Sequence, residues 1–255
     1  MAECRRFTLH ARDDERLRTK VRAAHTRSRR NYGSPRIHAE LREDGERTSR
    51  KRVARLMREE SLRGLQRRRF RRTTDSRHGL PVAPDRLARD FTASRPDSKW
   101  VGDITYVWTA EGWCYLAVLL DVFSRRVVGW ALRDTLGREL ALSALHKALL
   151  MRGVPSGQLV HHTDRGSQYA SSEYRRRLAA SGLLQSMSRP ADCYDNAMAE
   201  SFFATIKKEC IHRTSFATRT EAYDAIADCI ENFYNVERRH SAIGYVSPAR
   251  FERDY

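Results

Sequence analysis

The sequence predicts an α/β fold in which a mixed five-stranded sheet is flanked by helices and preceded by a small all-α domain. Two observations support this prediction. Residues 13–60 carry apolar side chains at helical spacing. Residues 99–235 begin with three strand-like segments joined by short turns and continue as helix, strand, helix, strand and helix. A chain of 255 residues, 40% of them hydrophobic, can build one large domain or two smaller ones.

The N-terminal region is expected to form three helices. The first covers residues 13–28, where apolar side chains recur on one face. Ser34 is a good N-cap for the second helix, and Pro35 suits its first position, where the missing N–H costs nothing. The third helix is expected to begin at residue 48 or 49 and to end at about residue 60.

A short helix, a tight turn and a basic helix together indicate a helix-turn-helix. The third helix has an apolar stripe of Val53, Leu56 and Met57, and most of its remaining surface is basic. A plain three-helix bundle with a solvated basic face is the alternative, but the density of arginine favours DNA binding. The residues expected at the DNA are Arg50, Lys51, Arg52 and Arg55, followed by Arg67, Arg68, Arg69, Arg71 and Arg72 in the next segment.

The positive charge is concentrated in the N-terminal part of the chain. Residues 1–98 contain 28 Lys and Arg against 14 Asp and Glu, a net charge of +14, whereas residues 99–255 contribute only +2 of the total of +16. This distribution indicates a polyanionic partner. Residues 1–72 form the predicted basic helical DNA-binding region, and residues 73–98, which contain three prolines and little periodicity, form the predicted linker.

Membrane attachment and secretion are not expected from this sequence. No apolar run approaches the ~20 residues that a membrane span requires. Residues 1–26 are charged throughout, unlike a secretory signal. The five cysteines are scattered and lack a Cys-x-x-Cys motif, which disfavours a disulfide framework or a zinc knuckle. The expected compartment is the cytoplasm, where thiols stay reduced.

Residues 99–235 are expected to form the larger domain, with residues 236–255 as a C-terminal segment. Residues 100–108, 113–122 and 125–132 are rich in aromatic and branched apolar side chains and predict an antiparallel meander. The order of the elements matches a ribonuclease-H-like fold. The remaining elements are expected as helix 137–151, strand 159–163, helix 171–180, strand 183–187, helix 195–210 and helix 218–234.

Three acidic residues stand in three separate motifs. Asp103 lies in Trp-Val-Gly-Asp-Ile-Thr-Tyr, Asp164 in His-Thr-Asp-Arg-Gly-Ser-Gln-Tyr, and Glu200 in Asp-Asn-Ala-Met-Ala-Glu-Ser-Phe-Phe. Glu200 shares a helix face with Asn196 and Lys207, and Lys207 either contacts DNA phosphate or is a solvated surface lysine. Carboxylates that converge in a fold supply the hard oxygen ligands that two Mg²⁺ ions need in phosphoryl transfer.

Seven stretches give the sequence a resemblance to known proteins. Residues 99–250 resemble the catalytic core of retroviral-type integrases. Almost the whole chain resembles the second-reading-frame transposases of bacterial insertion sequences that encode their transposase in two overlapping frames. The gap of 35 residues between Asp164 and Glu200 is part of the match. The stretches are residues 32–37, 52–57, 100–106, 121–125, 162–169, 195–203 and 234–248.

The resemblance implies that Asp103, Asp164 and Glu200 form a catalytic triad that holds Mg²⁺, for which Mn²⁺ can substitute. It also implies cleavage at the element ends and strand transfer into target DNA, with Asn196 and Lys207 near the DNA. Such enzymes are usually fused to a first-frame product that adds a further helix-turn-helix and a coiled coil, and this chain has no heptad region. The expected partners are DNA, the first-frame product and further copies of the chain, in the bacterial cytoplasm at the nucleoid.

Two other functions are consistent with parts of the sequence: a ribonuclease H or integrase of another element, and a non-catalytic DNA-binding regulator built on residues 1–72. The three acids argue against the regulator. Asp121 also ends a strand-like run, but we expect it to accept hydrogen bonds from the following turn or to pair with Arg125. Zinc is disfavoured at His161 and His162, because neighbouring strand residues point to opposite faces.

Overall fold

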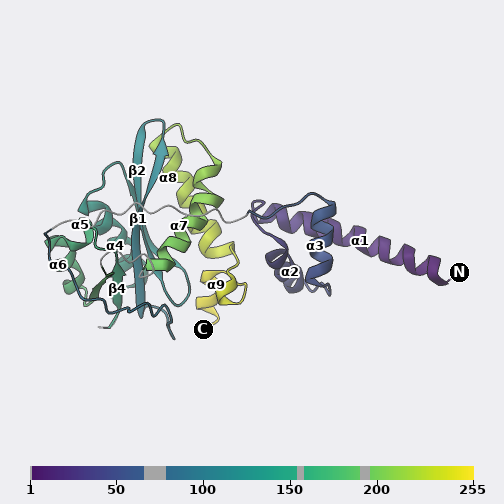
Figure 1. The fold of residues 1–255 in the computed structure, drawn as a ribbon, viewed down its shortest axis with the longest axis horizontal. Coiled ribbons are helices and arrows are strands. Elements are labelled where there is room, and N and C mark those ends of the chain that lie inside the picture. The colour runs from purple at the N-terminus through teal and green to yellow at the C-terminus, as the bar shows by residue number, and fades with distance from the viewer. Residues whose placement is uncertain (1, 66–78, 154–157, 190–195) are drawn as a thin grey trace. The chain divides into compact units, whose positions relative to one another are not determined.

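The computed structural model describes residues 2–65, 79–153, 158–189 and 196–255, and the chain divides into two compact units (Figure 1). One unit consists of Met1–Arg68 with Glu237–Val246, and the other of Arg69–Val236 with Ser247–Tyr255. Among the described residues, no helix is both long enough and apolar enough to cross a membrane.

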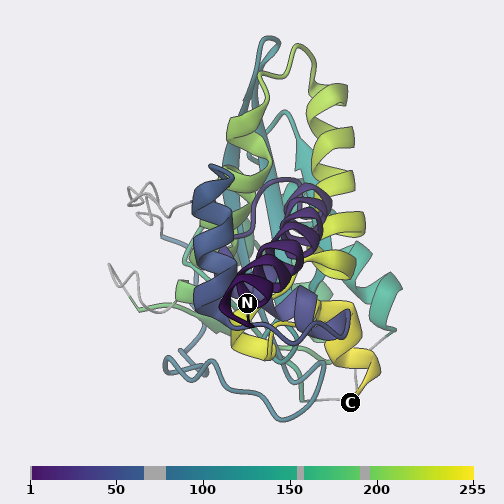
Figure 2. The ribbon, with the colours of Figure 1, turned by 90° about the vertical axis from the view of Figure 1, so that its right-hand side faces the viewer.

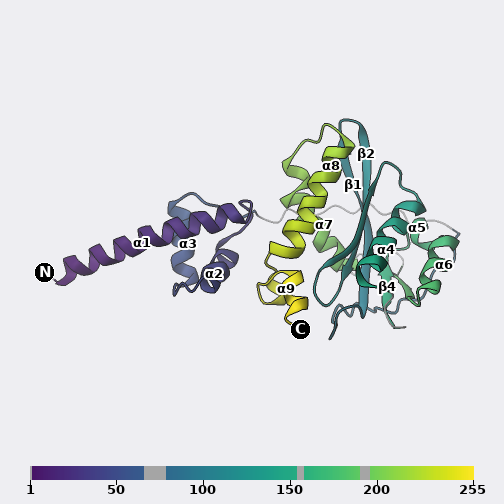
Figure 3. The same ribbon diagram turned by 180° about the vertical axis from the view of Figure 1, so that it is seen from behind.

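Three helices form the smaller unit: α1 (Ala2–Arg27), α2 (Ser34–Glu43) and α3 (Arg50–Glu59). Figures 2 and 3 show α2 and α3 beside the C-terminal half of α1. Helix α1 begins well before the predicted residue 13. Ser34 already belongs to α2 and Gly33 occupies the N-cap, so the predicted cap is wrong by one residue. The buried side chains between the helices are Leu17, Val21, Ala24, Ile37, Leu41, Val53, Leu56 and Met57.

Part of the C-terminal segment packs within the helical unit. The Tyr32 hydroxyl accepts a hydrogen bond from the backbone N of Arg239 at 2.7 Å. The Arg239 guanidinium forms an ion pair with Glu43 and donates to the carbonyl oxygen of Tyr245 at 3.0 Å. The remainder of the segment contains α9 (Pro248–Arg253), which belongs to the larger unit. The stretch predicted as one C-terminal segment is therefore divided between the two units.

Five described strands of the larger unit form one mixed sheet in the order β3-β2-β1-β4-β5. Strands β1 (Lys99–Thr109), β2 (Gly112–Asp121) and β3 (Val127–Arg133) form the antiparallel meander. Strands β4 (Val160–Thr163) and β5 (Leu184–Met187) continue the sheet in parallel from β1. The predicted mixed five-stranded sheet is confirmed.

Helices cover both faces of this sheet (Figure 1). Helices α4 (Arg138–Arg152), α5 (Ser167–Ala170) and α6 (Ser172–Ala180) bury one apolar core against it. On the other face lie α7 (Ala197–Glu209) and α8 (Arg219–Ala227), and α8 continues as a π-helical segment, Asp228–Glu237. The core on the α7 side contains Val101, Val107, Met198, Phe202 and Phe203.

Gly129 in β3 allows α4 to lie close to the sheet. A Cβ at this position would stand 2.2 Å from the carbonyl oxygen of Ala144 and 2.8 Å from the Cβ of Ala148. Both neighbours belong to the middle of α4, so the helix has no flexible atom that can give way. The absence of a side chain at Gly129 therefore sets the distance between helix and sheet.

We expect Gly129→Ala to destabilise the larger unit by about 3 kcal/mol, because α4 must move as a body to admit the methyl group. Chemical denaturation followed by circular dichroism measures the loss. Gly79→Ala is the matched control, since a Cβ there meets nothing within 4 Å. Equal stabilities of the two variants would contradict the close contact between β3 and α4.

Candidate active site

The register between β1 and β4 places Asp103 beside Asp164. The two strands run parallel, with Val101 opposite His162. Asp103 follows Val101 by two positions, and Asp164 follows His162 by two positions. The two acids therefore lie at the same height just beyond the paired segment. Asp164 directly follows the carboxyl end of β4, a position where ligand sites of open α/β sheets form, and Asp103 lies within β1 just beyond the segment paired with β4.

Local backbone bonds orient both aspartates. The Asp103 carboxylate accepts a hydrogen bond from the N of Ile104 at 2.8 Å. The Asp164 carboxylate accepts one from the N of Gly166 at 2.9 Å. A Cβ at Gly166 would lie 3.0 Å from that carboxylate and 2.8 Å from the Gln168 side chain. Glycine at this position thus lets the loop after β4 turn tightly around Asp164.

Glu200 reaches the same region from α7. Asn196 occupies the N-cap of this helix, and its side-chain nitrogen donates to the carbonyl oxygen of Gly102 at 3.2 Å. The start of α7 is thereby attached to the residue that precedes Asp103. Glu200 follows Asn196 by one helical turn, and the apolar side chains of Phe202 and Phe203 hold the opposite part of the helix in the core.

The electrostatics of Asp103 show that the predicted residues lie within range of one another. Burial raises the pKa of Asp103 well above its usual range, and the charges of Asp164 and Glu200 raise it further. The N–H of Ile104 and the charge of Lys207 lower that pKa. Burial lowers the pKa of Lys207 in turn, and the charge of Asp103 opposes this change. The charges of two further acids and one lysine therefore act on the Asp103 carboxyl.

The donor chemistry of this cluster fits a hard divalent cation. All three acids offer oxygen, and the amide oxygen of Asn196, buried beside Gly102, has no hydrogen-bond partner among the described residues. The side chains do not form a closed ligand set: in the described part of the chain, no three His, Cys, Asp or Glu residues are grouped so that they could hold a metal ion.

Asp121 has a structural environment. Its buried carboxylate accepts hydrogen bonds from the N and Oγ of Ser124, at 3.0 and 3.1 Å, and from the N of Asp97 at 2.8 Å. Burial raises the pKa of Asp121, and the Ser124 and Asp97 bonds oppose that shift. The carboxylate accepts from the turn that follows β2, as the sequence predicts. Arg125 contributes a backbone bond, from its N to the Asp121 carbonyl oxygen at 2.9 Å.

The two adjacent histidines are buried and bonded to protein groups. His161 Nε2 lies 2.8 Å from the Tyr174 hydroxyl, and His162 Nδ1 lies 2.8 Å from Ser186 Oγ. Burial, together with the neighbouring His162, lowers the pKa of His161 to about 3, so that it is neutral at physiological pH. These contacts hold β4 against α6 and β5.

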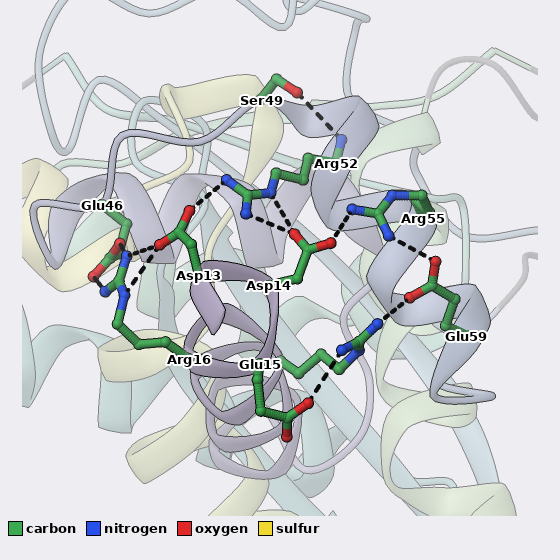
Figure 4. A network of polar contacts seen from close by, with 10 residues as sticks. Asp13, Asp14, Glu15, Arg16, Glu46, Ser49, Arg52, Arg55 and Glu59 are labelled. Carbon is green, nitrogen blue, oxygen red and sulfur yellow. Dashed lines mark hydrogen bonds and ion pairs between the residues drawn. The ribbon is translucent and has the colours of Figure 1, made fainter. Parts of the chain in front are cut away.

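The predicted DNA-contacting residues of α3 fall into two groups. Arg50 and Lys51 are exposed, with no ion-pair partner among the described residues. Arg52 instead pairs with Asp13 and Asp14 of α1, and Arg55 pairs with Asp14 and with Glu59 (Figure 4). Arg52 and Arg55 therefore fasten α3 to α1. The remaining predicted contacts, Arg67, Arg68, Arg69, Arg71 and Arg72, lie outside the described residues.

Sequence reasoning missed two features around the site. The Tyr169 hydroxyl is buried without a hydrogen-bond partner in the described chain. Burial is the main cause that raises the pKa of Tyr169, and the charges of Asp103 and Asp164 raise it further. The β1–β2 hairpin also carries exposed aromatic side chains: Trp108 lies opposite Trp113, and the exposed Tyr106 lies opposite the half-buried Tyr115. The aromatic residues at alternate positions of both strands were the available signal for this second feature.

We expect Asp103→Asn and Asp121→Asn to change stability in opposite directions. Without divalent cations, at a pH above the raised pKa of Asp103, Asp103→Asn should stabilise the protein by about 1 kcal/mol, because it removes a buried charge close to other carboxylates. Asp121→Asn should destabilise it by about 2 kcal/mol, because a buried acceptor of three bonds is altered.

Thermal unfolding in a metal chelator checks both changes. The gain from Asp103→Asn should shrink as the pH falls below the raised pKa of Asp103, since the native carboxyl is then already neutral. A loss of stability for Asp103→Asn that does not depend on pH would contradict the electrostatic account of the cluster.

Comparisons with known proteins agree on the family and the fold. Residues 93–193 match the integrase core domain, residues 181–248 match a further integrase core domain, and residues 12–70 match an HTH-like domain. The "Insertion element IS600 uncharacterized 31 kDa protein" of Shigella sonnei is 47% identical over 242 residues, covering 95% of this chain and 89% of that protein. The transposase InsF for insertion sequence IS3A of Escherichia coli (strain K12) is 46% identical over 232 residues, covering 91% and 80%.

A solved structure supports the fold alone. One chain in the simian T-cell lymphotropic virus intasome, solved in complex with PP2A regulatory subunit B56 gamma, has a TM-score of 0.53 and 16% sequence identity. The match covers 91% of this chain and 74% of that chain. The predicted integrase-like fold and the resemblance to insertion-sequence transposases are both confirmed.

Proposed function

We propose that this chain cuts DNA at the ends of an insertion element and joins those ends to target DNA. The chain belongs to the transposases of IS3-type insertion sequences, and it contains an HTH-like domain and an integrase core domain. The observation that carries the proposal is the parallel register of β1 and β4, which brings Asp103 level with Asp164. The charges of Glu200 and Lys207 also act on Asp103.

Asp103, Asp164 and Glu200 are the residues that would hold Mg²⁺. When bound there, the metal supplies positive charge that polarises the scissile phosphate and lowers the pKa of a water molecule. The half-buried Lys207 adds a cation on the same side, suited to a phosphate oxygen next to the scissile bond. Asn196 keeps α7 attached to β1 and so fixes the position of Glu200 relative to Asp103.

The strand-transfer step of the proposed reaction conserves bond energy. Before it, attack of water on the phosphodiester at the element end forms a P–O bond to the water oxygen, breaks the bond from phosphorus to the 3′ oxygen, and leaves a free 3′-hydroxyl and a 5′-phosphate; this hydrolysis is favourable by itself. Attack of the 3′-hydroxyl on a target phosphate then forms one P–O bond and breaks another, with the proton passing to the departing 3′ oxygen. Because this exchange of one phosphodiester for another is nearly balanced, the reaction needs neither ATP nor a covalent protein intermediate.

DNA is the proposed partner of both units. The helical unit carries the excess of positive charge, and residues 1–72 form the proposed DNA-binding region, with residues 99–235 as the catalytic core. Arg50 and Lys51 are exposed at the N-terminal end of α3, where a recognition helix presents its side chains. A first-frame product and further copies of the chain are proposed to complete the assembly on element ends.

We expect Glu200→Gln and Asp103→Asn each to reduce cleavage and strand transfer by more than 100-fold while DNA affinity is retained, because the acids serve the chemistry and not DNA anchoring. Mn²⁺ should replace Mg²⁺, and Ca²⁺ should permit binding without turnover. Cleavage of end-containing DNA measured on gels provides the readout.

The matched control for this experiment is Glu209→Gln. Glu209 lies on the same helix nine positions after Glu200, about two and a half turns away, and so faces the opposite side. Wild-type cleavage by Glu200→Gln would contradict the proposed triad. Calorimetric titration of Mn²⁺ into Asp103→Asn and Asp121→Asn would then test whether Asp103 or Asp121 is the metal ligand.

We expect Arg50→Ala combined with Lys51→Ala to lower DNA affinity and to reduce the slope of log K against log salt by about 2, since each lost phosphate contact removes ~0.9. Fluorescence anisotropy at several salt concentrations measures the slope. Arg175→Ala with Arg176→Ala, on the exposed face of α6, is the control pair. An unchanged slope in the α3 variant would exclude this helix from the interface.

A further inference from the structure

An open groove of about 1090 Å³ lies between the β1–β2 hairpin and the chain that follows α7. The hairpin side consists of Tyr106 and Trp108 of β1 with Trp113 and Tyr115 of β2. Lys207 and His212 lie on the other side. All of these residues belong to the larger unit. No Asp or Glu of the described residues lines the groove; beside the aromatic side chains and Lys207, its lining includes small, apolar and hydroxyl side chains such as Ala110, Ile211 and Thr214.

The aromatic side chains of the groove are unusually exposed for their size. Trp108 is 57% exposed, Trp113 is 50% exposed and Tyr106 is 37% exposed, whereas Trp100 and Trp130 are buried. The rings contact each other edge to face across the two strands, with centroids 4.9 Å apart for Trp108 and Trp113. This arrangement preserves ring faces for a ligand instead of burying them in the core.

The groove follows the edge of β1 that faces away from β2. Strand β4 pairs with this edge only at Lys99 to Val101, and the far end of the edge carries a single bridge from Thr109 to Phe216. Asp103 lies on the stretch between them, three residues before Tyr106, which corresponds to about 10 Å along the strand. Because strand side chains alternate between faces, Asp103 and Tyr106 point to opposite faces of the sheet, so the connection between the groove and the acids depends on Lys207 at this open edge.

Lys207 connects the groove to the acidic cluster. It lines the groove, and its charge also lowers the pKa of Asp103. A DNA backbone whose phosphate contacts Lys207 would extend from the acids into the groove. Bases can stack on aromatic side chains only when they are unpaired, because both faces of a paired base are covered by its neighbours in the duplex.

We propose that this groove binds unpaired nucleotides of the DNA strand beside the scissile phosphate, with bases stacked on Trp108, Trp113 and Tyr106. The inference rests on the proposed function, which identifies the strand as the one cleaved at the element end. It adds that the base pairs of the duplex open beside the scissile phosphate. The structure thus assigns the β1–β2 hairpin as a platform that separates the strand end from its complement.

Tryptophan fluorescence tests the platform without any cleavage step. The full-length chain, in a metal chelator, is titrated with a 12-nucleotide single strand, the same strand in a duplex, and an abasic strand of equal length. Because Trp100 and Trp130 are buried, quenching reports on Trp108 and Trp113. We expect the single strand to quench strongly, the duplex to quench weakly, and the abasic strand to bind without quenching.

Substitutions give a second measurement. Trp108→Ala with Trp113→Ala should weaken binding of the single strand at least 10-fold, since loss of a stacking aromatic typically costs roughly 5- to 150-fold per base. Trp108→Phe with Trp113→Phe should stay within about 3-fold of the native chain, because a phenyl ring still stacks. Tyr223→Ala, an exposed tyrosine outside the groove, is the control, and thermal unfolding verifies that every variant is folded.

Three outcomes would overturn the proposal: equal quenching by the abasic strand, native single-strand affinity in the double alanine variant, or fluorescence that changes only with protein concentration, as for self-association through the groove. Cleavage of end-containing DNA is assayed separately with Mg²⁺. Base-dependent quenching without cleavage would leave the groove in place and refute the catalytic proposal. Cleavage without base-dependent quenching would support the catalytic proposal and refute the stacking of bases in the groove.

Discussion

The site depends on three residue pairs between β1 and β4. This short parallel ladder is the only place where the meander meets the second half of the described sheet, and its register decides which residues stand level at the ends of the strands. A slip of one residue would turn the side chain of Asp164 to the other face of the sheet. The buried side chains of Trp100 and Val101, one in each apolar core, make such a slip costly.

The same region combines apolar packing with repulsion between like charges. Helix α7 buries its apolar side in the same core as β1, and the charges of Glu200 and Asp164 both act on Asp103. The Asn196 side chain holds the helix there through the backbone of Gly102. Fold stability thus supports an arrangement of like charges that is unfavourable by itself, which is typical of sites prepared for a cationic ligand.

Much of this arrangement follows from sequence patterns. The antiparallel meander, the mixed sheet and the placement of Asp103 in a strand, Asp164 after a strand and Glu200 on a helix can be predicted from alternation, helical spacing and the motifs around these acids. The roles of Arg52 and Arg55 could not, because an arginine on a basic helix looks the same whether it faces DNA or an acid such as Asp14 of α1.

Other features also depended on contacts between distant segments. The unpartnered Tyr169 hydroxyl and the groove beside Lys207 arise only when separate elements meet in space. The π-helical continuation of α8 was predicted as ordinary helix, because helical periodicity does not distinguish the two over a short segment.

The return of Glu237–Val246 to the helical unit has a consequence for synthesis on the ribosome. Arg239 is synthesised 207 residues after its partner Tyr32 and 196 residues after Glu43. Of the two units, the helical one therefore starts first and completes its packing last, after all five described strands of the sheet have been synthesised. A chain that stops before residue 237 lacks part of its N-terminal unit, so an incomplete product cannot carry that unit in finished form.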